Sequence, residues 1–224
     1  MSLTCNERNA RLSPVSDPQI HRPNSVDRQG LLHQERVWPE KQAQQNKMRV
    51  GILNVGSMTG RGRAIADLMN TRKVDVLCVQ ETRWRGNKAR ELGEGYKLIY
   101  SGANKEGRNG VGIILSSEMK NEVIEVNRKS DRIMWIRLTV REHTINIFSV
   151  YAPQAGCTDE EKDQFWDDMG EEIEKVEAEE KCIVGGDLNG HIGEDNNVIS
   201  RIHGGHGNGD RNIDGKRIID CCLL

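Results

Sequence analysis

Residues 48–82 read MRVGILNVGSMTGRGRAIADLMNTRKVDVLCVQET, and they hold two apolar runs separated by a glycine-rich turn and an amphipathic segment. Val50 to Asn54 has the composition of a short buried strand, and Val74 to Gln80 has that of a second one. Three apolar residues between them recur at positions i, i+3 and i+4, on one face of a helix: Ile65, Leu68 and Met69. A strand, a crossover helix and a second strand predict a parallel pair in an α/β sheet.

The middle of the chain predicts further strands with little helix between them. Gly110 to Leu115 is apolar throughout, and Met134 to Val140 alternates between apolar and polar residues. Arg141 to His143 fits a tight turn, so Thr144 to Tyr151 is expected to return beside the preceding strand. Such segments are typical of antiparallel hairpins.

A second helix has a clear start signal at Thr158, because Glu161 follows at the spacing of a capping box. Phe165, Met169 and Ile173 then recur at steps of four, and Val176 continues their apolar face. Cys182 to Asp187 predicts a last strand. Lys216 to Leu224 begins another amphipathic element, and we expect that the segment needed to pack against it is missing after it.

Composition divides the chain near Met48. Residues 1–47 contain four of the five prolines and are mostly polar, so we predict a disordered N-terminal tail there and one α/β domain over residues 48–224. The start of the chain has no apolar signal core and no run is long enough to span a membrane, which predicts an intracellular protein without a membrane partner. Local charge is uneven, since nine Lys/Arg face four Asp/Glu between residues 48 and 93. A polyanion is expected to meet that segment.

Oxygen-bearing side chains follow the predicted strands at the points where these end: Asn54, Glu81, Tyr151, Asp187 and Asn189. Each one alone is most simply a turn residue. Together they indicate a site, because open α/β sheets collect ligand groups at strand ends. Carboxylate and amide oxygens suit a hard cation such as Mg²⁺, and a tyrosine hydroxyl can donate to a phosphate. These groups favour metal-assisted cleavage of a phosphodiester.

Five short motifs occur in the order and rough spacing of a known superfamily: Leu53-Asn54-Val55, Gln80-Glu81-Thr82, Asn109 to Ile113, Ser149 to Pro153, and Gly186 to Asn189. From Met48 onward the chain resembles the endonuclease/exonuclease/phosphatase superfamily. It is most similar to endonuclease domains of non-LTR retrotransposons and to chains of the craniofacial development protein 2-like group. The resemblance implies a four-layer α/β sandwich of two mixed sheets flanked by helices, incomplete at the C-terminus.

The same resemblance implies roles for individual residues. Glu81 corresponds to the metal-binding glutamate, and Asn54 to the asparagine that supports the metal site. Tyr151 is similar to the tyrosine that contacts the scissile phosphate. Asp187 and Asn189 resemble the pair that positions the attacking water and stabilises the transition state. The implied activity is hydrolysis of DNA with Mg²⁺, or Mn²⁺ in its place, in a nuclear setting.

Two departures from the family pattern predict impaired activity. The chain ends before the family's Ser-Asp-His segment and an earlier aspartate hairpin, and general acid–base help is worth ~10²–10⁴ in rate. Gly56 stands where apurinic endonucleases often have a second acid. Without the later segments we expect an exposed sheet face and edge, and therefore poor solubility or a protein partner that covers them.

A run of cations surrounds the proposed metal ligand Glu81, and Arg83 and Arg85 are the nearest candidates for DNA binding. Trp84 lies among them and offers a surface on which a base can stack. A solvated loop is an equally good interpretation. For the whole chain, two other functions stay open: a phosphatase of the same superfamily, and a non-catalytic remnant or domesticated module that binds nucleic acid or protein.

Overall fold

The computed structural model describes residues 2–4, 47–194 and 209–223. The chain divides into two units, residues 1–7 together with 48–224, and residues 8–47. All elements described below belong to the first unit. The tail predicted to be disordered falls almost wholly outside the described residues.

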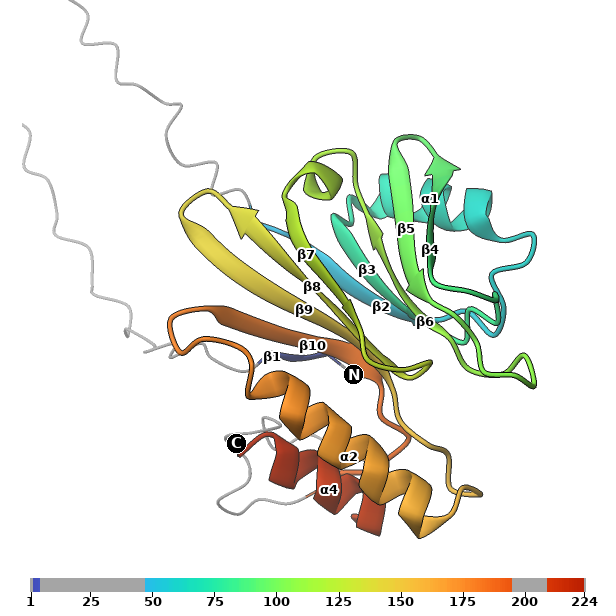
Figure 1. Ribbon diagram of the computed structural model, residues 1–224, viewed down its shortest axis with the longest axis vertical. Helices are drawn as coiled ribbons and strands as arrows, with labels where there is room; N and C mark the ends of the chain where they lie inside the picture. Colours follow the sequence, from blue (N-terminus) through green and yellow to red (C-terminus); the bar gives the residue numbers. More distant parts are fainter. Residues whose placement is uncertain (1, 5–46, 195–208, 224) are drawn as a thin grey trace, which may run out of the picture. The chain divides into compact units, whose positions relative to one another are not determined.

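The first sheet has five strands in the order β2-β3-β6-β5-β4, and only its first pair is parallel. Helix α1 (Gly62–Arg72) connects the two parallel strands, which confirms the predicted crossover. Figure 1 shows α1 beside this sheet. The strands are β2 (Val50–Asn54), β3 (Val76–Gln80), β4 (Lys88–Gly93), β5 (Tyr96–Ser101) and β6 (Val111–Leu115).

The second sheet also has five strands, in the order β1-β10-β9-β8-β7, with one parallel pair, β10 and β9. The predicted hairpin is confirmed, and Arg141 in its turn has a φ of 59°. A three-residue helix, η1 (Met119–Asn121), precedes β7. The strands are β1 (Ser2–Thr4), β7 (Val123–Arg128), β8 (Ile133–Val140), β9 (His143–Tyr151) and β10 (Lys181–Asp187).

Strand β1 differs from the sequence prediction, because it belongs to the segment expected to be disordered. Ser2, Leu3 and Thr4 pair with Gly185, Val184 and Ile183 at the edge of β10. An exposed strand edge offers unpaired backbone donors and acceptors, so even a polar segment can add there. The sequence gives no sign of this pairing, because its partner lies about 180 residues away.

The two sheets pack face to face, and helices cover their outer faces. Alternate residues of β3, β6, β8 and β9 form the core between the sheets. The opposite face of the first sheet packs on α1. The outer face of the second sheet packs on α2 (Asp159–Ile173). The predicted fold class is thus confirmed: an α/β sandwich with two mixed sheets and flanking helices.

Helix α1 corrects one detail of the expected packing. Ile65 and Met69 are buried as predicted, but Leu68 is 44% exposed and Ala66 takes the third buried position. The buried face of the helix is therefore rotated toward Ala66 relative to the face that the apolar pattern suggested. Short side chains such as alanine allow a helix to approach a sheet closely, which hydrophobicity alone does not reveal.

The α2 start is confirmed, with Thr158 Oγ1 accepting from the Glu161 amide and Glu161 Oε2 accepting from the Thr158 amide. The helix ends at Ile173, so Val176 packs from the following turn. Helix α4 (Ile213–Cys221) packs against segments that come before it in the chain, so its apolar face is covered without any later segment. Its Ile218 and Ile219 are buried beside residues of α2 and of the segment after β10, and Figure 1 shows the two helices together.

A buried ion pair joins these two helices, since Lys162 Nζ of α2 lies 2.9 Å from Asp214 Oδ2 of α4. Both side chains are nearly buried, at 11% and 12% exposure.

No helix in the described part of the chain is long and apolar enough to cross a membrane.

Candidate active site

The site forms where the two parallel strand pairs end. In the first sheet Asn54 pairs with Gln80, and Glu81 follows directly. In the second sheet Tyr151 pairs with Asp187. Because parallel strands end at the same edge and the two sheets are stacked, residues more than 130 positions apart come together.

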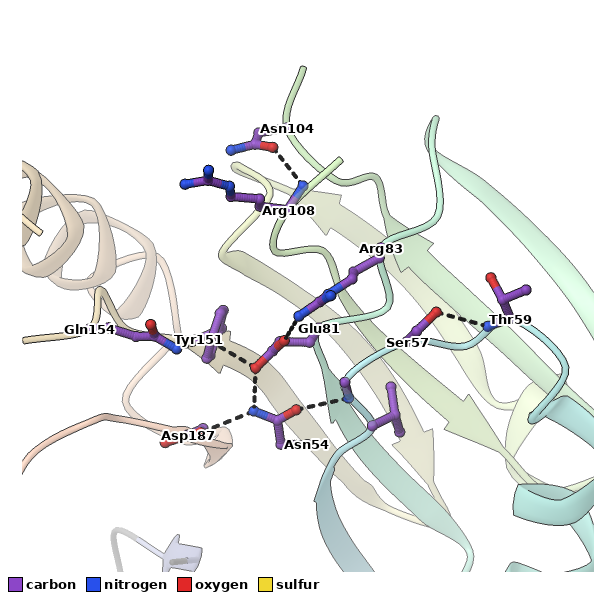
Figure 2. A network of polar contacts seen from close by, with 12 residues as sticks. Asn54, Ser57, Thr59, Glu81, Arg83, Asn104, Arg108, Tyr151, Gln154 and Asp187 are labelled. Atoms are coloured by element: carbon purple, nitrogen blue, oxygen red, sulfur yellow. Dashed lines mark hydrogen bonds and ion pairs between the residues drawn. The ribbon is translucent and has the colours of Figure 1, made fainter. Parts of the chain in front are cut away.

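Asn54 connects the two sheets at this edge (Figure 2). Its Nδ2 donates to Glu81 Oε1 at 2.9 Å and to Asp187 Oδ2 at 3.2 Å. Its Oδ1 accepts from the Gly56 amide at 3.0 Å, which orients the side-chain amide. The nitrogen of Asn54 therefore faces the carboxylates, and its hydrogen bonds hold Glu81 and Asp187 in place.

Glu81 is held by three side chains. Besides Asn54, Tyr151 OH donates to Oε1 at 3.0 Å and Arg83 Nη2 donates to Oε2 at 2.6 Å. Burial raises the pKa of Glu81, but hydrogen bonds from Asn54, Arg83 and Tyr151 and the charge of Arg83 outweigh it and lower the pKa below its usual value. Glu81 is therefore ionised at neutral pH.

Backbone hydrogen bonds hold the loop around Glu81 in place. Glu81 and Arg83 have φ values of 57° and 54°, in the left-handed region. The amides of Thr82 and Arg83 donate to the carbonyls of Gly110 and Asn109, while the Thr82 carbonyl accepts from Met58. These bonds fix a loop conformation that would otherwise be strained, and so fix the direction of the Glu81 side chain.

Glycine is required at position 110 for two reasons. Its φ is 89°, and a Cβ there would collide with Thr82 Oγ1. The motif Asn109 to Ile113, which the sequence showed without a stated role, thus supports the loop that carries Glu81.

Tyr151 is 3% exposed, and its hydroxyl lies between Glu81 and Gln154, whose Nε2 donates to it at 2.8 Å. Burial, together with the hydrogen bond to Glu81 and the charge of Glu81, raises the pKa of Tyr151 to about 12. The hydroxyl stays protonated and serves as a donor. Sequence reasoning missed Gln154, although it directly follows the Ser149 to Pro153 motif.

Asp187 is the last residue of β10, and Asn189 lies on the loop that follows it. The Asn189 amide donates to Asp187 Oδ1 at 3.3 Å, and its Nδ2 donates to the Ala152 carbonyl at 2.7 Å. Asn189 also has a left-handed φ of 48°. Asn189 therefore ties Ala152, directly after β9, to Asp187 at the end of β10, a connection that spacing alone did not indicate.

The basic residues around the site are less available than their sequence suggested. Arg83 pairs with Glu81, whereas Arg85 is exposed. Trp84 is half-buried, in an edge-to-face contact with Tyr100 and with the guanidinium of Arg90 over its ring, 4.8 Å from the centroid. The proposed stacking surface is thus covered in part by the chain itself.

Other cations near Glu81 in sequence have structural partners. Arg61 Nη1 donates to the Val55 carbonyl, and Arg63 pairs with Asp67 and Glu94. Two further cations of this stretch, Lys88 and Arg90, lie in strand β4. A second loop, which carries the exposed side chains of Lys105 and Arg108, lies beside the loop of Arg83. The two loops are joined by a hydrogen bond from the Arg83 amide to the carbonyl of Asn109. We call the border of the site that these two loops form the rim, and Figure 2 shows Arg108 there.

The donor set at the strand ends suits a hard divalent cation. Two carboxylates, Glu81 and Asp187, accept from the same Asn54 nitrogen, so their oxygens are close together. Within residues 2–4, 47–194 and 209–223 no group of three or more His, Cys, Asp or Glu forms a metal cluster. Mg²⁺ commonly uses one or two protein carboxylates and keeps several waters, so a two-carboxylate site agrees with its chemistry.

A cavity of about 390 Å³ adjoins the two carboxylate-bearing strand ends. Among its lining residues, Gln80 is fully buried, and its Oε1 has no hydrogen-bond partner within the described structure. The lining is formed by Ile52, Leu53, Asn54, Gln80, Gly186, Asp187, Leu188, Gly190, Ile192 and Ile218.

Solved structures with the same fold include two endonucleases. An AP endonuclease from Archaeoglobus fulgidus has a TM-score of 0.56 and 22% identity, over 79% of this chain and 70% of that one. The endonuclease domain of TRAS1, a telomere-specific non-LTR retrotransposon, has a TM-score of 0.57 and 16% identity, over 78% and 70%. A Neisseria 3′ phosphatase, NExo, bound to a product DNA hairpin, has a TM-score of 0.56 and 18% identity, over 79% and 70%.

Among curated proteins, craniofacial development protein 2 of Bos taurus and of Tragulus javanicus are each 28% identical over 174 residues, or 77% of this chain. The matched region spans 29% and 30% of the length of these relatives. The model of the Endonuclease/Exonuclease/phosphatase family matches residues 51–218, which include every site residue described above. This chain therefore belongs to the endonuclease/exonuclease/phosphatase family.

Proposed function

We propose that this chain hydrolyses phosphodiester bonds in DNA with the help of Mg²⁺ or Mn²⁺ at the Glu81–Asp187 edge. The observation that carries the proposal is the shared donor Asn54, which holds carboxylates of both sheets within hydrogen-bond distance of one nitrogen. Two like charges this close need a compensating cation, and among the described residues Arg83 supplies one at Glu81.

In this proposal Glu81 and Asp187 bind the cation, and Asn54 positions both carboxylates. A bound divalent cation polarises a phosphoryl oxygen and stabilises the charge that develops on it. The Tyr151 hydroxyl, protonated because its pKa is about 12, gives up its hydrogen bond to Glu81 and donates instead to a phosphate oxygen. Asp187 and Asn189 orient the water that attacks the phosphorus.

DNA is favoured over smaller phosphoesters by the charges on the rim. Arg83, Arg85, Lys105 and Arg108 give this edge exposed cations on two loops, which suits contact with several successive phosphates. A small phosphomonoester needs only one such contact. The structural likeness to DNA-acting proteins agrees with this choice, although it concerns those proteins' own substrates.

Slow turnover is expected from the side chains that form the site. The described network contains carboxylates, amides, a phenol and a guanidinium, but no imidazole. We propose that this described network by itself turns over slowly, because general acid–base help such as a histidine gives is worth ~10²–10⁴ in rate.

A nicking assay tests the proposal. Supercoiled plasmid and a duplex with an abasic site are incubated with and without Mg²⁺, beside Glu81→Gln and Asp187→Asn. Metal-dependent nicking that both variants abolish is expected. Glu118→Gln is the matched control, because Glu118 is exposed before η1, away from the site.

One observation favours a second function, a DNA-binding module without catalysis. Arg83 already occupies Oε2 of Glu81, so the site is neutralised in part without a metal. DNA binding that is independent of metal, with no nicking at any metal concentration, would support this second function over the first.

A further inference from the structure

Both oxygens of Glu81 are engaged by side chains of the chain itself. Oε1 accepts from Asn54 and Tyr151, and Oε2 accepts from Arg83 at 2.6 Å. Among these donors only Arg83 is positively charged. Its guanidinium therefore occupies the side of the carboxylate where a metal cation would also be attracted.

The position of Arg83 in the loop is fixed, but its charged end is not. Its φ of 54° and the hydrogen bond from its amide to the Asn109 carbonyl hold the backbone. The side chain is 52% exposed, whereas that of Glu81 is 16% exposed. The guanidinium can therefore leave Glu81 by side-chain rotation, without any change in the fold.

We propose that Arg83 is an exchangeable counter-cation that couples metal binding to DNA binding, an inference that rests on the proposed function. Without DNA, Arg83 neutralises Glu81 and competes with the divalent cation for Oε2. A DNA phosphate presents the guanidinium with an alternative anion and draws it away. The carboxylate is then open to the metal, so each ligand promotes binding of the other.

The size of the effect follows from the exposure of the pair. Exposed ion pairs are worth up to about 1 kcal/mol, which corresponds to about fivefold in an equilibrium constant. Metal affinity without DNA should therefore rise about fivefold when the charge of Arg83 is removed. A merely structural role for Arg83 predicts the opposite, because loss of a bond that positions Glu81 would weaken metal binding.

The first experiment measures Mn²⁺ binding to the free protein by electron paramagnetic resonance. Wild type, Arg83→Gln, Arg83→Lys and Glu81→Gln are compared, with circular dichroism to verify folding. We expect tighter binding by Arg83→Gln, affinity near wild type for Arg83→Lys, and loss of binding by Glu81→Gln. Lys181→Gln is the charge-matched control, since Lys181 is exposed at the far end of β10 from Asp187.

The second experiment measures affinity for a labelled, phosphorothioate-linked duplex by fluorescence anisotropy at constant ionic strength. Mn²⁺ should tighten binding of wild type, and this gain should be absent from Arg83→Gln. Metal affinity of Arg83→Gln equal to or below that of wild type overturns the proposal for Arg83. Wild type and Glu81→Gln that bind Mn²⁺ equally overturn the proposed function itself, so the two failures are distinguishable.

Discussion

The side-chain nitrogen of Asn54 lies 2.9 Å from Oε1 of Glu81 and 3.2 Å from Oδ2 of Asp187. Asn54 and Glu81 come from the first sheet, and Asp187 comes from the end of the second. One amide thus joins the two halves of the sandwich at the edge where the proposed reaction takes place.

Asn54→Ala should reduce affinity for Mn²⁺ and plasmid nicking by about ten- to a hundredfold, as loss of a group that orients metal ligands commonly does. The fold should persist, because Asn54 is exposed at the end of β2. Titration with Mn²⁺ and the nicking assay measure the effect. Asn70→Ala, on the exposed face of α1, is the matched control, and an equal loss in both variants would contradict the prediction.

Glu81 should stabilise the fold more at neutral pH than in acid. Its pKa lies below the usual value in the folded chain. Such a group contributes stability above its unfolded pKa, and that contribution is lost as the pH falls through the folded pKa. Urea unfolding of wild type and Glu81→Gln should therefore differ more at about pH 7 than at about pH 3. A difference that does not change with pH would show that Glu81 makes no such contribution.

Gly110→Ala should disturb the site, because a methyl group there collides with Thr82 and displaces the loop that carries Glu81. Gly107→Ala provides a close comparison. Its φ of 74° is also left-handed, but a Cβ there meets no atom within 4 Å. Both changes should cost about 1–2 kcal/mol of stability through backbone strain. Only Gly110→Ala should also weaken Mn²⁺ binding, and equal binding by both variants would count against this role of Gly110.

Lys162→Met should destabilise the chain by about 3 kcal/mol, because it leaves the Asp214 carboxylate nearly buried without its closest cation. Arg217, at 3.5 Å, replaces that cation only in part. Urea unfolding measures the change. The double variant Lys162→Met with Asp214→Leu should recover much of the loss, since no unpaired charge remains. A double variant as unstable as the single one would mean that the packing of α4 on α2 requires the charges of Lys162 and Asp214.

Local patterns in the sequence were sufficient for several elements. The parallel crossover of β2, α1 and β3 followed from residues within one stretch of about 30 positions. The Thr158–Glu161 capping box likewise specified the start of α2. In these elements the relevant hydrogen bonds and apolar contacts join near neighbours, so their periodicity is visible in the chain itself.

The sequence also determined which residues could form a site, since Asn54, Glu81, Tyr151 and Asp187 stand at strand ends with suitable chemistry. Only the tertiary structure decided how they are used. It turned the nitrogen of Asn54 toward the carboxylates, placed Arg83 on Glu81 and gave α4 its partner in α2. These outcomes depend on contacts between segments far apart in the chain, and such contacts leave no periodic pattern in the sequence.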